Sequence, residues 1–142
     1  MKKILVMLVE DNPAEIELTR EIFSSAYPQY QLTVASDGEE ATTMLAAALE
    51  NPRTLPDIIL MDLNLPRKDG RQVLAEIKSD PDLRRIPVIV MSSSSAEEDV
   101  NYVYRECGNC FVKKPLQLQD FFDIIDAVHH FWVEVATLPR KF

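Results

Sequence analysis

The stretch that decides the fold is residues 4–13, ILVMLVEDNP, in which six apolar residues are followed by two acids, an asparagine and a proline. Six apolar residues without polar alternation are typical of a strand buried on both faces of a parallel sheet. Asn12 before Pro13 predicts the start of a helix, because asparagine caps free backbone N–H groups and proline fits the first turn. The stretch therefore predicts a buried strand, an acidic turn and a helix.

The same order recurs along the chain, because short runs rich in Val and Ile alternate with stretches whose apolar residues recur every three to four positions. The predicted strands span residues 4–9, 31–35, 57–61, 87–91 and 109–112. A helix is expected after each strand: Ser95 opens the fourth, and the fifth runs from about Leu118 to beyond Trp132. Right-handed crossovers then predict an α/β fold, a five-stranded doubly wound parallel sheet (β/α)5 with a C-terminal helical extension.

The composition indicates one folded domain, since 46% of the 142 residues are hydrophobic and 27% are charged. A net charge of −8 argues against nucleic-acid binding, which needs a basic face to neutralise phosphates. The first apolar run ends in acids where a signal peptide needs small residues, and no run approaches the roughly 18 apolar residues that span a bilayer. We expect a cytoplasmic protein with no membrane partner.

Chemically active side chains follow the predicted strands at the edge where parallel strands end. Glu10 and Asp11 follow the first strand, Asp62 the third and Ser92 the fourth, and Lys114 comes just after the fifth. Open parallel sheets bind ligands at this edge, so we expect these side chains to converge on one cleft. Crowded carboxylates repel one another unless they take up protons or hold a cation.

A hard divalent cation suits this acidic group, because Mg²⁺ prefers oxygen ligands in an octahedron and keeps several waters. We predict that Asp11 and Asp62 are direct ligands and that the backbone carbonyl of Asn64 is a third. Glu10 is expected to act through a water molecule. The sequence therefore predicts a Mg²⁺ site at this edge of the sheet.

With a metal bound, Asp62 becomes an oxygen nucleophile that can attack a phosphorus atom and form an acyl phosphate. Lys114 then acts as a point charge on one phosphate oxygen. Ser92 donates its hydroxyl to another, which draws its loop inward.

These motifs together resemble the signature of response-regulator receiver domains. The residues that carry the resemblance are Val9-Glu10-Asp11-Asn12, Ile59-Leu60-Met61-Asp62-Leu63-Asn64-Leu65-Pro66, Asp69-Gly70, Pro87-Val88-Ile89-Val90-Met91-Ser92 and Lys114-Pro115. The resemblance implies a flavodoxin-like, CheY-like receiver domain over residues 1–130 and an extension over 131–142. It also implies a signalling switch that takes a phosphoryl group from a histidine kinase on Asp62, with Ser92 and Phe111 as switch residues.

A narrower resemblance rests on residues 92–99, on Asn109-Cys110-Phe111 and on Phe131-Trp132 with Leu138-Pro139. These segments are similar to those of stand-alone receivers that partner cyanobacterial and bacterial phytochrome histidine kinases. The resemblance implies a red-light-sensing kinase as partner. The residues alone indicate only a phosphohistidine donor.

Two other functions remain as alternatives. A phosphatase of the haloacid dehalogenase type also uses a strand-end Asp, a lysine and Mg²⁺, but it needs a second Asp where this chain has Asn64. A phosphorylation-independent interaction module would have a degenerate site, which the intact acidic, serine and lysine set argues against. Cys107 and Cys110 form a C-x-x-C, but it lacks the second pair of ligands of a zinc site and the strand-to-helix order of a redox motif.

The last predicted helix has more apolar surface than one sheet can cover. At about 100° per residue, one stripe contains Leu118, Phe121, Ile125, Val128 and Trp132. The neighbouring face contains Ile124, Ala127, Phe131 and Val135. Either the tail folds back over its own domain, or the chain forms a symmetric homodimer through helix four, strand five, helix five and the tail, with Tyr102 or Tyr104 as aromatic anchors.

Overall fold

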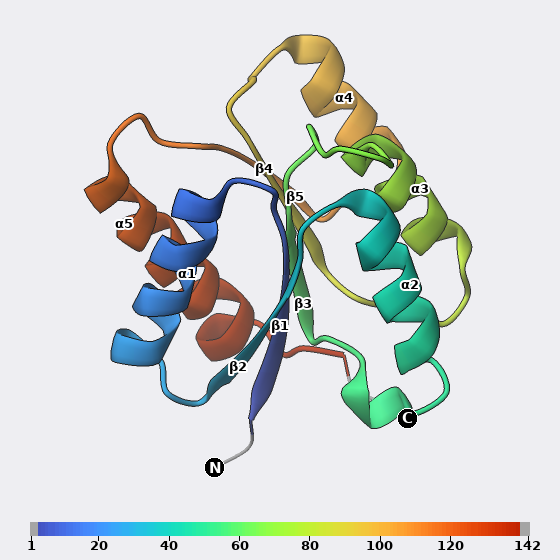
Figure 1. Ribbon diagram of the computed structural model, residues 1–142, viewed down its shortest axis with the longest axis horizontal. Helices are drawn as coiled ribbons and strands as arrows, with labels where there is room; N and C mark the ends of the chain where they lie inside the picture. Colours follow the sequence, from blue (N-terminus) through green and yellow to red (C-terminus); the bar gives the residue numbers. More distant parts are fainter. Residues whose placement is uncertain (1–2, 140–142) are drawn as a thin grey trace.

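The computed structural model describes residues 3–139 and contains the alternating strands and helices that the sequence predicts (Figure 1). The elements are, in chain order, β1 (Ile4–Val9), α1 (Pro13–Ala26), β2 (Tyr30–Ala35), α2 (Gly38–Ala48), η1 (Pro52–Thr54), β3 (Ile58–Met61), α3 (Gly70–Ser79), β4 (Val88–Ser92), α4 (Glu97–Arg105), β5 (Cys110–Lys113), α5 (Leu118–His129) and η2 (His130–Val135). Each strand begins and ends within one residue of its predicted bounds.

The five strands form one parallel sheet in the order β2-β1-β3-β4-β5. Helices α1 and α5 cover one face of the sheet, and α2, α3 and α4 cover the other (Figure 1). The predicted doubly wound (β/α)5 fold is confirmed. Its strand order reverses between β1 and β3, the place where such sheets bind ligands at the carboxyl ends of their strands.

The core has two layers because successive residues of a strand point to opposite faces of the sheet. Leu8, Leu60 and Met91 pack towards α1 and α5. Val9 and Met61 pack towards α2 and α3. Burying one such side chain stabilises the fold by roughly 1.5–3 kcal/mol, so the strands are firmly held and the polar residues that follow them emerge at fixed points.

The helix starts are set largely by the side chains that precede them. The Asn12 Oδ1 accepts hydrogen bonds from the N–H groups of Ala14 and Glu15, as the predicted cap requires. The prediction that Ser95 opens the fourth helix was wrong, since α4 begins at Glu97 after Ala96. The preceding serine, Ser94, turns the chain instead, because its Oγ accepts the N–H of Ala96.

The predicted C-terminal helical extension is present, and the helical residues continue beyond Trp132 as expected. The α-helix ends at His129, and the chain continues as a single π-helical segment, His130–Val135. Trp132 and Leu138 pack against the α1 and α5 side of the core, so this part of the tail folds back over its own domain. Leu118 is 66% exposed, and its predicted place on the sheet-covering stripe was wrong.

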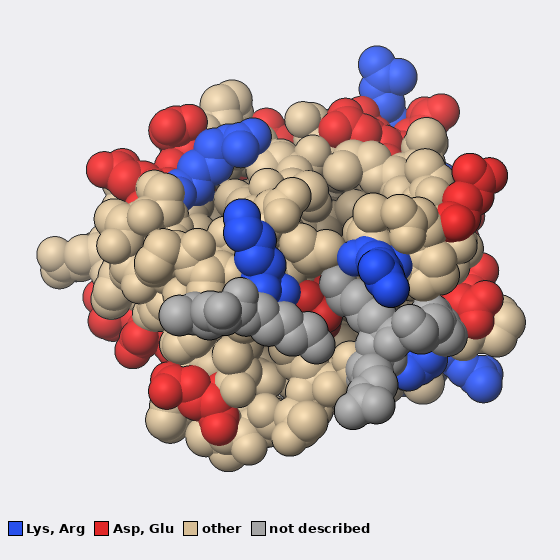
Figure 2. Space-filling view, turned by 90° about the horizontal axis from the view of Figure 1, so that it is seen from below, with Lys and Arg blue, Asp and Glu red and all other residues tan. Residues whose placement is uncertain are grey.

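Two surface properties bear on the expected partners. None of the helices in residues 3–139 has both the length and the apolar character needed to cross a bilayer. On the face drawn in Figure 2, the basic side chains of the described residues are separated by uncharged and acidic ones. That face carries no continuous basic patch of described residues.

Candidate functional site

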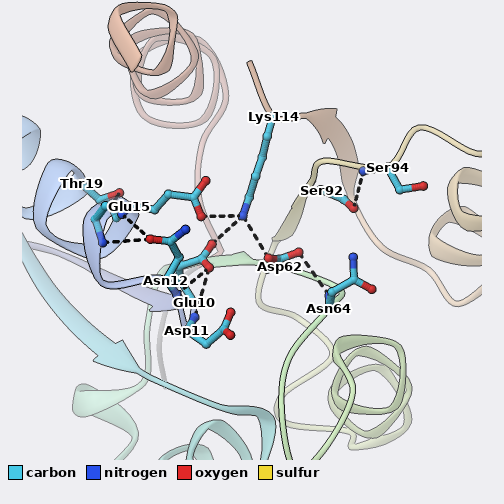
Figure 3. Close-up of polar contacts among 11 residues, drawn as sticks. Glu10, Asp11, Asn12, Glu15, Thr19, Asp62, Asn64, Ser92, Ser94 and Lys114 are labelled. Atoms are coloured by element: carbon cyan, nitrogen blue, oxygen red, sulfur yellow. Dashed lines mark hydrogen bonds and ion pairs between the residues drawn. The ribbon is translucent and has the colours of Figure 1, made fainter. Parts of the chain in front are cut away.

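The predicted site residues lie together at the carboxyl edge of the sheet, where backbone hydrogen bonds continue one residue beyond the strands. The Asp62 N–H donates to the Val9 carbonyl at 3.0 Å, and the Lys114 N–H donates to the Ser92 carbonyl at 2.8 Å. The backbone of each polar residue is therefore held by the neighbouring strand. The side chains that follow β1, β3 and β5 face one another as a result (Figure 3).

The centre of the site is the Lys114 ammonium, which binds three carboxylates from three parts of the chain (Figure 3). Its Nζ lies 2.7 Å from Glu10 Oε1, 2.9 Å from Glu15 Oε2 and 3.0 Å from Asp62 Oδ2. The lysine side chain is only 10% exposed. Burial alone would lower its pKa, but the three hydrogen bonds to carboxylates outweigh burial and raise the pKa above its usual value.

The acidic group beside this lysine consists of Glu10, Asp11 and Asp62, each of which offers a carboxylate oxygen within 4.8 Å of the others. The Glu10 Oε2 accepts the N–H groups of Asp11 and Asn12, both at 3.1 Å. Burial nevertheless raises the pKa of Glu10 to about 7, against the opposing effect of Lys114. These carboxylate oxygens are crowded, and Glu10 and Asp62 have the Lys114 ammonium as their shared cation. Such a group of oxygens is suited to bind a hard divalent metal ion.

The loop after β3 holds Asp62 in place from the other side. The Asn64 N–H donates to Asp62 Oδ1 at 3.2 Å, while Oδ2 contacts the lysine. The Gly70 N–H donates to the Leu63 carbonyl at 2.8 Å, which closes the loop. A Cβ atom on Gly70 would lie 2.3 Å from the Asp62 carbonyl oxygen, so only glycine lets α3 start this close to the loop.

Comparison with known proteins agrees with this geometry. The family pattern of the response regulator receiver domain matches residues 6–126. The response regulator Rcp1 of Synechocystis is 42% identical over 138 residues, which are 95% of this chain and 92% of that protein. The chain belongs to the response regulator receiver family.

The fold of this receiver is also similar to that of two solved response regulators. The phosphorylated cyanobacterial phytochrome response regulator RcpA superposes with a TM-score of 0.91 at 43% identity and covers 97% of this chain and 99% of that structure. The Mn²⁺-bound form of Rcp1 gives a TM-score of 0.87 at 40% identity, over 96% and 99% of the two chains. The chain is thus a response regulator of the signalling-switch class, similar to phytochrome-associated regulators.

The serine loop of the receiver is tied to α3 by a chain of polar contacts. Ser92 is fully buried, and its Oγ accepts the Ser94 N–H at 3.2 Å (Figure 3). The Ser94 hydroxyl donates to Asp99 Oδ2 at 3.0 Å, and Asp99 binds Arg71 at 2.5 Å. The hydrogen bond from Arg71 lowers the pKa of Asp99. The loop that carries Ser92 is therefore connected to the start of both α3 and α4.

Phe111, the predicted switch aromatic, lies in β5 beside α4. Its side chain is half-buried against the core layer under α2, α3 and α4. Its N–H donates to the hydroxyl of Tyr104 at 3.1 Å, and Tyr104 is 52% exposed. The phenylalanine thus points inward, and the neighbouring tyrosine is at the surface.

The contacts that were not predicted from the sequence include that of Glu15 with Lys114 and that of Ser94 with Asp99. Glu15 and Asp99 are acids in the first turn of a helix, and such acids are ordinarily explained by the helix dipole, so their contacts were not expected. The position of the two acids in the chain could have indicated these contacts, since the first turn of a helix after a parallel strand lies above the carboxyl edge of the sheet.

Proposed function

We propose that Asp62 accepts a phosphoryl group from a histidine kinase, in the presence of Mg²⁺, and that this modification switches the surface of the receiver. The single observation that carries the proposal is the Asp62 carboxylate, held 3.0 Å from the Lys114 ammonium and beside Glu10 and Asp11. A carboxylate between a fixed cation and a metal site is suited to attack on phosphorus, because the negative charge of the incoming group is neutralised.

The metal that fits this donor set is Mg²⁺, with Asp11 and Asp62 as direct ligands, the Asn64 carbonyl as a third ligand and Glu10 acting through water. The bound ion would neutralise carboxylate charge and lower the electrostatic cost of a phosphoryl group on Asp62. The backbone N–H groups of Asp11 and Asn12 hold Glu10 beside the site.

The phosphoryl group would be bound by Lys114 and Ser92. The ammonium is already in contact with Asp62, so it needs little movement to reach a phosphoryl oxygen. The Ser92 Oγ accepts a hydrogen bond from Ser94, which leaves the hydrogen of its own hydroxyl for another phosphoryl oxygen. Movement of this loop would change the packing next to Phe111, the proposed aromatic switch.

We infer that the kinase is of the phytochrome type. The support is the likeness to RcpA, a cyanobacterial phytochrome response regulator, over nearly the full length of both chains. A cytoplasmic location and the absence of nucleic-acid and membrane partners go with this assignment. We assign residues 1–130 to the receiver domain and 131–142 to an extension.

We further propose a homodimer formed by α4, β5, α5 and the extension. Residues 140–142 of the extension lie outside the described part of the chain. The support is a set of exposed large apolar side chains on these elements, Tyr104, Leu118, Phe122, Phe131 and Val135. Phe131 and Val135 are 51% and 62% exposed, whereas Trp132 packs against its own core. The exposed pair, but not the tryptophan, is available for a second copy.

Phosphotransfer tests the central proposal. A phytochrome-type kinase labelled on its histidine should transfer label to the protein when Mg²⁺ is present, and the label should be acid-labile and sensitive to hydroxylamine. Asp62→Asn should accept none, with its fold intact, because only the nucleophile and one ligand charge are removed. Undiminished acid-labile label on that variant would refute the assignment.

A further inference from the structure

Glu15 is a third carboxylate on the lysine of the site, and it comes from neither the acidic group nor the phosphoacceptor loop. A lysine ammonium has three N–H donors. All three are used, by Glu10 at 2.7 Å, Glu15 at 2.9 Å and Asp62 at 3.0 Å. Figure 3 shows the Glu15 side chain reaching from α1 to the lysine. The ammonium is therefore shared with an anion that has no part in metal binding or phosphoryl acceptance.

The position of Glu15 is set by its own backbone contacts. Its N–H donates to Asn12 Oδ1 at 3.3 Å, and its carbonyl accepts the hydroxyl of the buried Thr19 at 2.7 Å. Its side chain is only 21% exposed. By contrast, Glu17 on the same helix is exposed and serves as a comparison. The contact between Glu15 and Lys114 is thus part of a partly buried network and differs from a solvated surface pair.

The charge of Glu15 acts on the same point where a phosphoryl group would sit. Its carboxylate oxygen and that of Asp62 both lie within 3.0 Å of the Lys114 Nζ. The two anions are therefore no more than about 6 Å apart, a distance at which like charges still repel in a partly buried site. Phosphorylation would replace the single charge of Asp62 by a group with more negative charge, so this repulsion would increase.

We propose that Glu15 is a positioning residue that holds Lys114 back and opposes the negative phosphoryl group, so that it limits how far the phosphorylated state accumulates. This inference rests on the proposed function of Asp62. In the resting protein Glu15 keeps the ammonium centred among the carboxylates. After phosphorylation it competes with the phosphoryl oxygens for the same three hydrogens.

Fluoroberyllate, an anion that stands in for a phosphoryl group on a carboxylate, provides the test. Its affinity is measured by calorimetry at saturating Mg²⁺ for the full chain and for Glu15→Gln, which keeps the shape but removes the charge. We expect about three- to tenfold tighter binding in Glu15→Gln, from the loss of one like charge about 6 Å away. Glu17→Gln, the matched control, should bind as the unchanged protein does.

A second readout separates a role through Lys114 from a merely structural one. In a Lys114→Met background, Glu15→Gln should tighten fluoroberyllate binding by clearly less, because the direct repulsion remains but there is no ammonium to release. A gain that is equal in both backgrounds, or no gain at all in the folded single variant, overturns the proposal. If fluoroberyllate binds Asp62→Asn as well as the unchanged protein, the proposed function itself fails, and the inference about Glu15 falls with it.

Discussion

Replacing Lys114 by methionine keeps the apolar stem of the side chain and removes the ammonium that joins Glu10, Glu15 and Asp62. Removing one partner of a buried ion pair ordinarily costs about 3–5 kcal/mol, because the remaining charge is left uncompensated. The lysine is 10% exposed and Glu15 is 21% exposed, so partial solvation places the expected cost near the lower figure. For a domain of this size about 3 kcal/mol corresponds to a Tm lower by roughly 10 °C.

The same substitution should strengthen metal binding, since the carboxylates lose the cation that competes with Mg²⁺ for them. We expect the affinity for Mg²⁺ to rise about tenfold and the metal to restore part of the lost stability. Thermal unfolding followed by circular dichroism, in chelator and in Mg²⁺, measures both effects. Lys113→Met is the matched control, because the neighbouring lysine is exposed and should change neither. A Tm in chelator within about 2 °C of the unchanged protein, or weaker Mg²⁺ binding, would refute the reasoning.

Two further predictions concern the acidic group and the extension. Burial raises the pKa of Glu10 from 4.5 to about 7. The metal-free protein should therefore lose stability as pH rises across this interval, because the folded carboxyl holds its proton more tightly than the unfolded one. Calorimetry should show Mg²⁺ binding weaken about tenfold from pH 8 to pH 6, as protons compete with the metal, and a flat profile would contradict this. Changing Phe131 and Val135 to glutamate should give a folded monomer in sedimentation. Changes at Trp132 should also unfold the tail. If the unchanged protein is monomeric both with and without a phosphoryl group on Asp62, the dimer proposal is refuted.

The sequence was sufficient for most of the fold because its signals are local. The apolar run 4–9 and the acids that follow it place β1 and the edge of the sheet without ambiguity. Asn12 caps its helix as predicted, since its side chain accepts two backbone N–H groups of the following turn. The end of α5 was not predictable in this way, because the change to a π-helical segment at His130 leaves the apolar pattern almost unaltered.

The site was predictable to the extent that strand ends determine it. The acids of β1 and β3 and the lysine after β5 converge as expected, because parallel strands bring their carboxyl ends to one edge. The contacts of Glu15 and Asp99 were missed because they depend on where a helix side chain points in three dimensions. Periodicity does not encode that direction at the first turn of a helix.

The central claim is that Asp62 is the phosphoacceptor, and site-resolved mass spectrometry tests it most directly. The protein is incubated with a small-molecule phosphodonor and Mg²⁺, and the modified residue is located after reductive trapping of the acyl phosphate. We predict one phosphoryl group, on Asp62, absent when Mg²⁺ is chelated and absent in Asp62→Asn, with Asp82→Asn as an exposed control that is modified normally. A phosphoryl group found on another residue, or retained by Asp62→Asn, would contradict the account.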